Sequence, residues 1–146
     1  MNRLKLLKFG VALKITKTTR LPTFIGNTIR GAFGKALPEH GEARGRVFKT
    51  SPTESVPNPF VISAPYPGRS TYSAGDILGF SLTLIGAARD YESEVRAALG
   101  GMCNGRLESA EVAAVSTIYD REWSDGGAET IPRCGKLSVN FITPTE

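Results

Sequence analysis

Apolar and polar side chains alternate along residues 4–16, near the start of the chain. Every second position is apolar, at Leu7, Phe9, Val11, Leu13 and Ile15. A period of two places these side chains on one face of a strand and places Lys8 and Lys14 on the other. The pattern predicts a half-buried β-strand with a basic open face.

A helical period replaces the alternation in residues 21–37. One broad arc of the helix carries the apolar side chains, namely Phe24, Ile25, Thr28, Ile29, Ala32, Phe33 and Ala36. The opposite arc carries Asn27, Arg30, Gly31, Gly34 and Lys35. Each interior glycine costs about 1 kcal/mol relative to alanine. Close approach of another backbone, a phosphate or a partner would offset that cost, so the outer arc is predicted to be a contact surface.

The rest of the chain predicts further strands and one more helix. After Pro38 comes a loop over 39–59, followed by strands over 60–62 and 78–85. Asp90 is expected to cap the second helix, and Gly100 and Gly101 are expected to end it in the left-handed conformation. A strand over 107–119 and a last short strand over 137–141 follow. The order is β-α-β-β-α-β with an extra C-terminal strand. It predicts an α+β, ferredoxin-like (RRM-like) domain, with a four-stranded antiparallel sheet and both helices on one face.

Charge is distributed unevenly along the 146 residues. Residues 1–50 hold eleven Lys and Arg against two Asp and Glu, whereas residues 51–146 hold seven against twelve. A basic block of this kind favours an anionic partner, of which nucleic acid is the commonest. A solvated basic face is the alternative, and charge alone does not separate the two.

The remaining composition excludes several classes of protein. Lysines interrupt the N-terminal apolar residues before a signal-peptide core forms, and no stretch is long enough to cross a bilayer, so a cytoplasmic location and no membrane partner are expected. Cys103, Cys134 and the single His40 stand at no familiar zinc spacing. We therefore expect free thiols, no structural metal and no cofactor.

Three blocks of sequence stand together in an order that resembles a known family. They are residues 21–34, with an apolar-Gly-x-Thr-apolar-Arg-Gly-Ala core; residues 58–62 with 72–86; and Asp90-Tyr91 with a glycine-rich exit through Gly100, Gly101 and Gly105. The chain resembles the CRISPR-associated endoribonucleases of the RAMP superfamily, which process precursor CRISPR RNA. The likeness covers nearly the whole chain.

The resemblance also implies a division of the chain. Members of that family usually carry two ferredoxin-like domains, and the segment from Leu137 to Pro144 is similar to the first strand of the second. We therefore expect a RAMP domain over 1–135 and the start of a second domain, or a C-terminal extension, over 136–146. The family places a glycine-rich RNA-binding loop near the end of its second domain. Without that loop, cleavage is expected only if a second domain completes the enzyme.

Two residues are candidates for metal-independent RNA cleavage. The family often uses a histidine in or just after the first helix as the base that takes the 2′-hydroxyl proton, and His40 is the candidate by position. Lys35 would supply positive charge to the phosphate. The alternatives are a solvated surface histidine and a solvent-facing helix lysine.

The candidate RNA-binding residues come from the basic front third and from one loop. They are Asn27, Arg30, Arg44, Arg46, Tyr66 and Arg69. Tyr66, Arg69 and Tyr72 interleave aromatic and basic groups, which suits stacking and pairing with a single-stranded base. A hairpin loop with packed tyrosines is the alternative.

The leading hypothesis is a protein that binds CRISPR repeat RNA and takes part in its cleavage by 2′-hydroxyl attack. A second hypothesis is a non-catalytic RAMP module that holds guide RNA or docks to other CRISPR effector subunits. A third is an assembly protein whose glycine-faced helix packs on a partner. Whether the chain forms a homodimer stays open.

Overall fold

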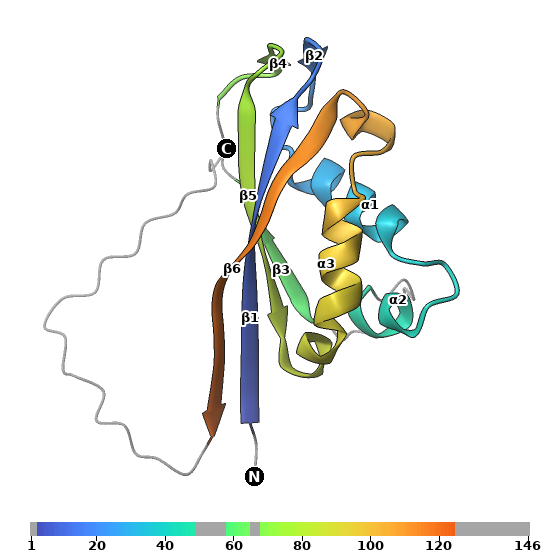
Figure 1. Cartoon of the computed structure of the whole chain (residues 1–146), viewed down its shortest axis with the longest axis vertical. Helices are drawn as coiled ribbons and strands as arrows, with labels where there is room; N and C mark the ends of the chain where they lie inside the picture. Colours follow the sequence, from blue (N-terminus) through green and yellow to red (C-terminus); the bar gives the residue numbers. More distant parts are fainter. Residues whose placement is uncertain (1–2, 49–57, 65–67, 125–146) are drawn as a thin grey trace, which may run out of the picture.

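The computed structural model describes residues 3–48, 58–64 and 68–124 (Figure 1). The elements in chain order are β1 (Arg3–Ile15), β2 (Thr19–Arg20), α1 (Gly26–Ala36), α2 (Glu42–Val47), β3 (Phe60–Ser63), β4 (Thr71–Tyr72), β5 (Ile77–Ile85), the 3₁₀ helix η1 (Gly86–Tyr91), α3 (Glu92–Gly100), the 3₁₀ helix η2 (Gly105–Leu107) and β6 (Ala110–Ser124). The predicted strand over 137–141 and the predicted domain boundary after residue 135 lie outside the described residues.

The main sheet has four strands in the order β3-β5-β1-β6, and every neighbouring pair is antiparallel. All the helices lie on one side of it (Figure 1). The predicted α+β class and antiparallel sheet are confirmed, and the arrangement is compatible with a ferredoxin-like fold. A second, two-stranded sheet, in which β2 pairs with β4, was not predicted.

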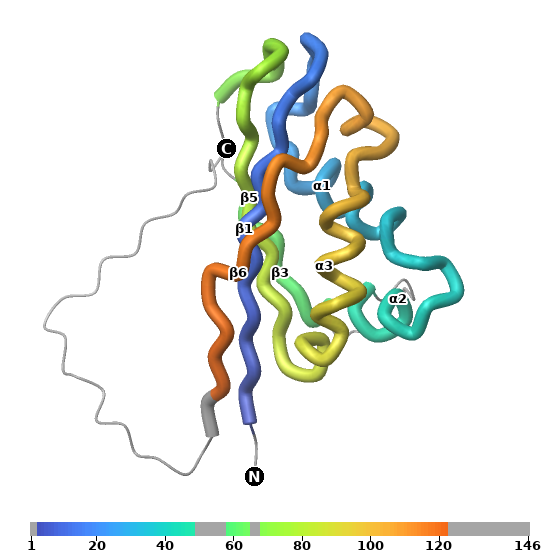
Figure 2. The backbone as a smooth tube through the Cα atoms, viewed as in Figure 1, coloured from blue at the N-terminus to red at the C-terminus, as the bar shows by residue number. Residues whose placement is uncertain are grey.

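Strand β6 pairs with β1 along its length, and the pairing register shifts at two points. Its register against β1 shifts between Lys8 and Phe9 and again between Ala12 and Leu13. Bulges of this kind bend a strand and increase its twist. Figure 2 shows β6 bent midway along β1.

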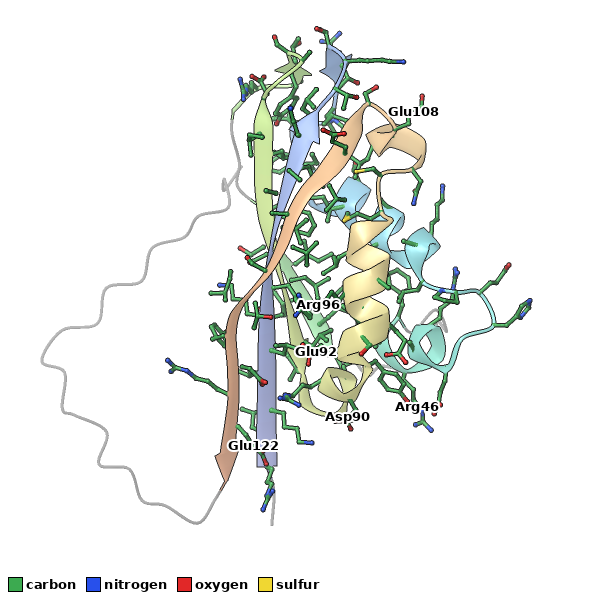
Figure 3. All side chains as sticks on the ribbon, viewed as in Figure 1. Arg46, Asp90, Glu92, Arg96, Glu108 and Glu122 are labelled. Atoms are coloured by element: carbon green, nitrogen blue, oxygen red, sulfur yellow. The ribbon has the colours of Figure 1, made fainter. Side chains whose placement is uncertain are left out.

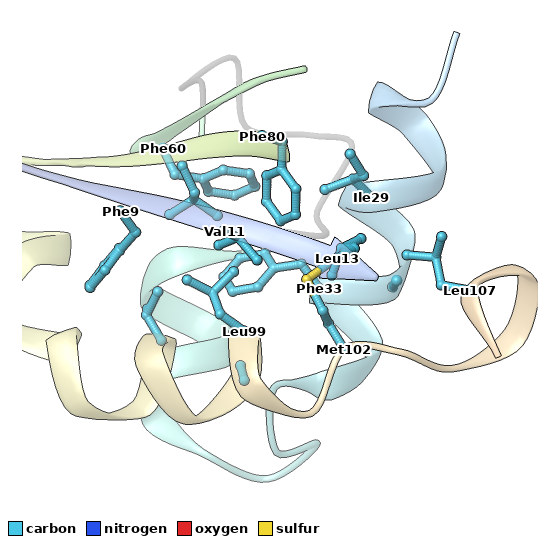
Figure 4. Packing of buried hydrophobic residues seen from close by; sticks show 14 of the residues in the cluster. Phe9, Val11, Leu13, Ile29, Phe33, Phe60, Phe80, Leu99, Met102 and Leu107 are labelled. Carbon is cyan, nitrogen blue, oxygen red and sulfur yellow. The ribbon is translucent and has the colours of Figure 1, made fainter. Parts of the chain in front are cut away.

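The core lies between the sheet and the helices. Leu7, Phe9, Val11, Leu13 and Ile15 are at most 3% exposed, so the alternation of β1 is confirmed. Figure 4 shows Ile29 and Phe33 of α1, Leu99 of α3, and Met102 and Leu107 packed against this face. Burial of these side chains holds the helices and the loop before β6 against the sheet.

Helix α1 differs from the predicted arcs at two positions. Gly34 is buried, because the Phe48 ring lies against it, so its placement on the outer arc was wrong. Phe24 is 56% exposed rather than buried, because α1 begins only at Gly26 and Phe24 precedes it. Gly31 is exposed as predicted, and apart from its chain neighbours and the nearby backbone of α1, no described atom lies within 4 Å of the position that a Cβ would take.

Two other local predictions were wrong. The predicted loop over 39–59 contains the short helix α2, which buries Ala43 and Val47. Asp90 does not cap α3: the cap position is Tyr91, and the Asp90 carboxylate lies 3.4 Å from Lys5 Nζ. The helix ends at Gly100 as expected, but Gly101 has a φ of −108°, so the left-handed residue is Gly105, with a φ of 54°.

Candidate nucleic-acid interface

A groove runs between helix α1 and the loop that contains η2. We call it the α1–η2 groove; its lining residues are Asn27, Thr28, Gly31, Ala32, Lys35, Asn104, Gly105 and Arg106, and its volume is about 250 Å³. Asn27, Gly31 and Lys35 are spaced four apart and therefore lie on one face of α1. The bare backbone at Gly31 leaves the middle of this wall open.

The opposite wall is a turn fixed against α1. Gly105 adopts the left-handed conformation, which glycine tolerates without steric cost. The Leu107 N–H donates to the Asn104 carbonyl at 3.0 Å, and the Leu107 side chain is buried. The Asn104 side chain donates from Nδ2 to the Ala32 carbonyl of α1 at 3.4 Å. These contacts hold the turn beside the helix and so define the groove.

The groove carries positive charge. Lys35 and Arg106 are both exposed, and within the described part of the chain neither forms an ion pair with a carboxylate. Lys35 Nζ lies 3.8 Å from the position of a Cβ on Gly105, so the lysine reaches across from α1 to the opposite wall. No Asp or Glu lines the groove. An anion would therefore be attracted to it.

A second hollow adjoins the groove at Arg106. Its lining residues are Arg20, Leu21, Pro22, Thr23, Ser70 and Arg106, and its volume is about 540 Å³. We call it the Arg20 hollow. Because Arg106 lines both hollows, Arg20, Arg106 and Lys35 lie along one connected surface. A surface of this kind suits an extended polyanion better than a single small ion.

A third hollow, on the helix-free face of the sheet, has different chemistry. Its volume is about 530 Å³, and small or apolar residues line it, namely Gly10, Val11, Ala12, Ser63, Ala64, Gly79, Phe80, Ser81, Ala114 and Ser116. None of these side chains is ionisable. The hollow therefore offers nothing that would attract a phosphate or activate a nucleophile.

Among the predicted site residues that the structure describes, only Asn27 and Lys35 line the groove. Arg30 points to the other side of α1, where its guanidinium lies 5.4 Å from the centre of the Phe48 ring. Arg44 donates to the Leu37 carbonyl at 3.3 Å and so binds the end of α1. Arg46 lies on α2, at the opposite end of the helical layer from Glu108, which follows η2 (Figure 3). These three arginines do not extend the groove.

The predicted aromatic and basic loop is described only in part. Tyr66 lies outside the described residues. Arg69 lies 4.8 Å from the centre of the Tyr72 ring and 3.5 Å from the Asp76 carboxylate. The Tyr72 side chain is buried, so it offers no stacking face to a base. For Tyr72, the alternative of a packed tyrosine therefore fits better than that of an aromatic surface on which a base stacks.

His40 lies in the turn that follows α1, where the Gly41 N–H donates to the Pro38 carbonyl at 3.1 Å. The side chain is exposed and does not line the α1–η2 groove. No hydrogen bond joins it to another residue in the part of the chain that the structure describes. Lys35 thus lies in the last turn of α1 and His40 in the turn that follows the helix, but they are not assembled into one site.

Sequence reasoning missed Asn104, Arg106 and Arg20. The family resemblance includes the glycine-rich exit from the second helix but does not extend to the function of its polar neighbours. The signal that was available is an Asn-Gly pair followed by Arg between a helix and a strand, because Asn-Gly favours a tight turn.

Shifted pKa values occur away from the groove. The hydrogen bond from Arg89 lowers the pKa of Asp120, and Nε of Arg89 lies 2.7 Å from the carboxylate. Desolvation raises the pKa of Tyr91, as does its hydrogen bond to Glu42. Desolvation also raises the pKa of Cys103, so its thiol is less reactive than a free one.

The described residues contain no group of three or more His, Cys, Asp and Glu that would hold a metal ion. No helix among them is long and apolar enough to span a membrane.

Comparison with known protein families gives a match over most of the chain. The family model AF_1859_N, described as an N-terminal domain, matches residues 4–139. No curated protein matches the chain. The match covers every described element of the main sheet and both walls of the α1–η2 groove.

Proposed function

The chain belongs to the AF_1859_N family, and from its sequence resemblance and its basic groove we propose that it is a CRISPR-associated RAMP module that binds CRISPR repeat RNA. The observation that carries the proposal is the α1–η2 groove, which carries Lys35 and Arg106 and has bare backbone at Gly31. A module of this kind would act in the cytoplasm, where CRISPR transcripts are made.

The shape and charge of the surface support single-stranded RNA as the ligand. The groove has a volume of about 250 Å³, and Arg106 also lines the Arg20 hollow beside it. A single strand can lay successive phosphates along cations arranged in this way, while its bases remain free to point outwards. Gly31 allows the strand to approach the helix backbone closely.

Binding to labelled repeat RNA tests the proposal. In fluorescence anisotropy, the double variant Lys35→Ala, Arg106→Ala should lose tenfold or more in affinity. The logarithm of the binding constant falls linearly with the logarithm of the salt concentration. If Lys35 and Arg106 each contact one phosphate, the magnitude of that slope should be smaller by about 1.4 in the double variant. Lys14→Ala is the matched control, because it removes one exposed positive charge from the helix-free face of the sheet. Equal losses in the control and the double variant would contradict the proposal.

Cleavage of the RNA by 2′-hydroxyl attack is the second candidate function. The observation that favours it is the exposure of His40 in the turn after α1, on the same helix end as Lys35. A neutral imidazole can accept a proton, which suits a general base. Binding without cleavage, as a guide-RNA or effector-docking module, is the alternative, and the His40 variant discussed below separates the two.

A further inference from the structure

Asn104, which lines the α1–η2 groove, carries a buried hydrogen-bond acceptor that no donor among the described residues satisfies. Among the described residues, the buried side-chain oxygens without a hydrogen-bond partner are Oη of Tyr72 and Oδ1 of Asn104. Only Asn104 lines the groove. A buried acceptor without a donor is unfavourable, so a ligand that supplies one gains affinity.

The orientation of the Asn104 amide is fixed. Its Nδ2 donates to the Ala32 carbonyl at 3.4 Å, and a reversed amide would direct its oxygen at that carbonyl instead. The free oxygen is therefore an acceptor held by α1. It requires an N–H or O–H from the ligand and would repel a phosphate.

The neighbours of Asn104 define the rest of the ligand. Lys35 and Arg106 line the same groove and carry the positive charge that a phosphate needs. The ligand should therefore present a hydrogen-bond donor close to an anionic phosphate. In a ribonucleotide strand the 2′-hydroxyl stands beside the 3′-phosphate, whereas DNA has the phosphate and lacks the hydroxyl.

We propose that Asn104 is the specificity-determining residue that selects ribose over deoxyribose, by accepting a hydrogen bond from a ligand 2′-hydroxyl at Oδ1. This inference rests on the proposed RNA binding and adds a residue and an atom to it. The oxygen is buried in the free chain, so a side chain at the groove must move to admit the hydroxyl. Lys35, an exposed lysine that reaches to Gly105, is flexible enough to do so when it turns to a phosphate.

Three probes of one repeat sequence test the inference: RNA, DNA and 2′-fluoro RNA. The fluoro probe keeps the sugar shape of RNA but cannot donate a hydrogen bond. Wild-type protein should bind RNA about tenfold more tightly than either other probe, because each leaves the buried oxygen unsatisfied. Equal affinity for RNA and 2′-fluoro RNA would overturn the inference, even if DNA binds weakly.

Asn104→Leu adds an independent measurement. Leucine has a similar volume but no acceptor. The variant should therefore bind RNA and 2′-fluoro RNA with the same affinity, so that the ratio of the two affinities approaches one. An unchanged ratio in a variant that melts cooperatively would overturn the inference. If none of the probes binds wild-type protein, the proposed function fails as well; if all bind equally, only the role of Asn104 fails.

Discussion

A Cβ placed on Gly34 would lie 2.9 Å from Cζ of the Phe48 ring. That ring is stacked on Phe60, with 5.8 Å between ring centres, and the guanidinium of Arg30 lies over it. Gly34 is therefore required by packing, and not by a ligand. Gly31, one turn earlier on the same helix, has open space where a Cβ would stand.

The same substitution at these two glycines should change stability in opposite directions. Gly31→Ala should raise the free energy of unfolding by about 0.5–1 kcal/mol, because alanine is the better helix former. Gly34→Ala gains the same propensity but overpacks the Phe48 ring, at a cost of about 1–3 kcal/mol, so a net loss of about 1 kcal/mol is expected. Urea denaturation of both variants measures the difference. A stabilised Gly34→Ala protein would show that the ring moves away without cost.

A larger side chain at Gly31 should block the groove without unfolding the chain. Gly31→Leu places four carbons into a volume of about 250 Å³, and leucine is well tolerated in a helix. We expect an affinity for repeat RNA at least tenfold below that of Gly31→Ala, with similar melting temperatures for the two variants. Anisotropy and thermal melting measure the two properties. Full RNA binding by the leucine variant would place the RNA elsewhere.

The sheet and the main helices were predictable because their patterns are long and consistent with burial. The alternation at Leu7, Phe9 and Val11 carries over directly into β1. Helix α2 was not predictable in this way. It has six residues, which is too short for stability in isolation, and it depends on burial of Val47 and on the bond from Arg44 to the end of α1.

The candidate site was predictable on one wall only. Asn27 and Lys35 lie two helical turns apart, so the helical period alone places them on one face. Asn104 and Arg106 join them through packing of the turn before β6 on α1, a relation between segments far apart in the sequence. For the same reason no local period could show that Phe48 covers Gly34.

The pairing of Arg89 with Asp120 should make stability depend on pH in acid. The hydrogen bond from Arg89 lowers the pKa of Asp120 below its ordinary value near 3.9. A lowered pKa means that the pair contributes stability above about pH 4 and loses it as the pH falls through the folded-state pKa. Asp120→Asn should therefore be less stable than wild type at pH 7, and the difference should shrink below about pH 4.

Urea denaturation at pH 7, 5 and 3 measures this difference. Glu122→Gln is the control, because it removes a carboxylate of the same strand from a more exposed ion pair with Arg3. If the difference in free energy of unfolding between Asp120→Asn and wild type stays constant from pH 7 to pH 3, the Arg89–Asp120 pair is not the source of the pH dependence.

Substitution of His40 decides between cleavage and binding alone. His40 is exposed and does not line the α1–η2 groove, so His40→Ala should leave the affinity for repeat RNA within about twofold of wild type. If the imidazole takes the 2′-hydroxyl proton, its loss should lower the cleavage rate by a factor of about 10²–10⁴. Denaturing gels of repeat RNA incubated with EDTA measure the rate, and Glu39→Ala, an exposed neighbour in the same turn, serves as the control. Unchanged cleavage by His40→Ala would exclude it as the base. Bound but uncut RNA with wild-type protein would instead favour the non-catalytic module, because binding through the groove does not require a general base.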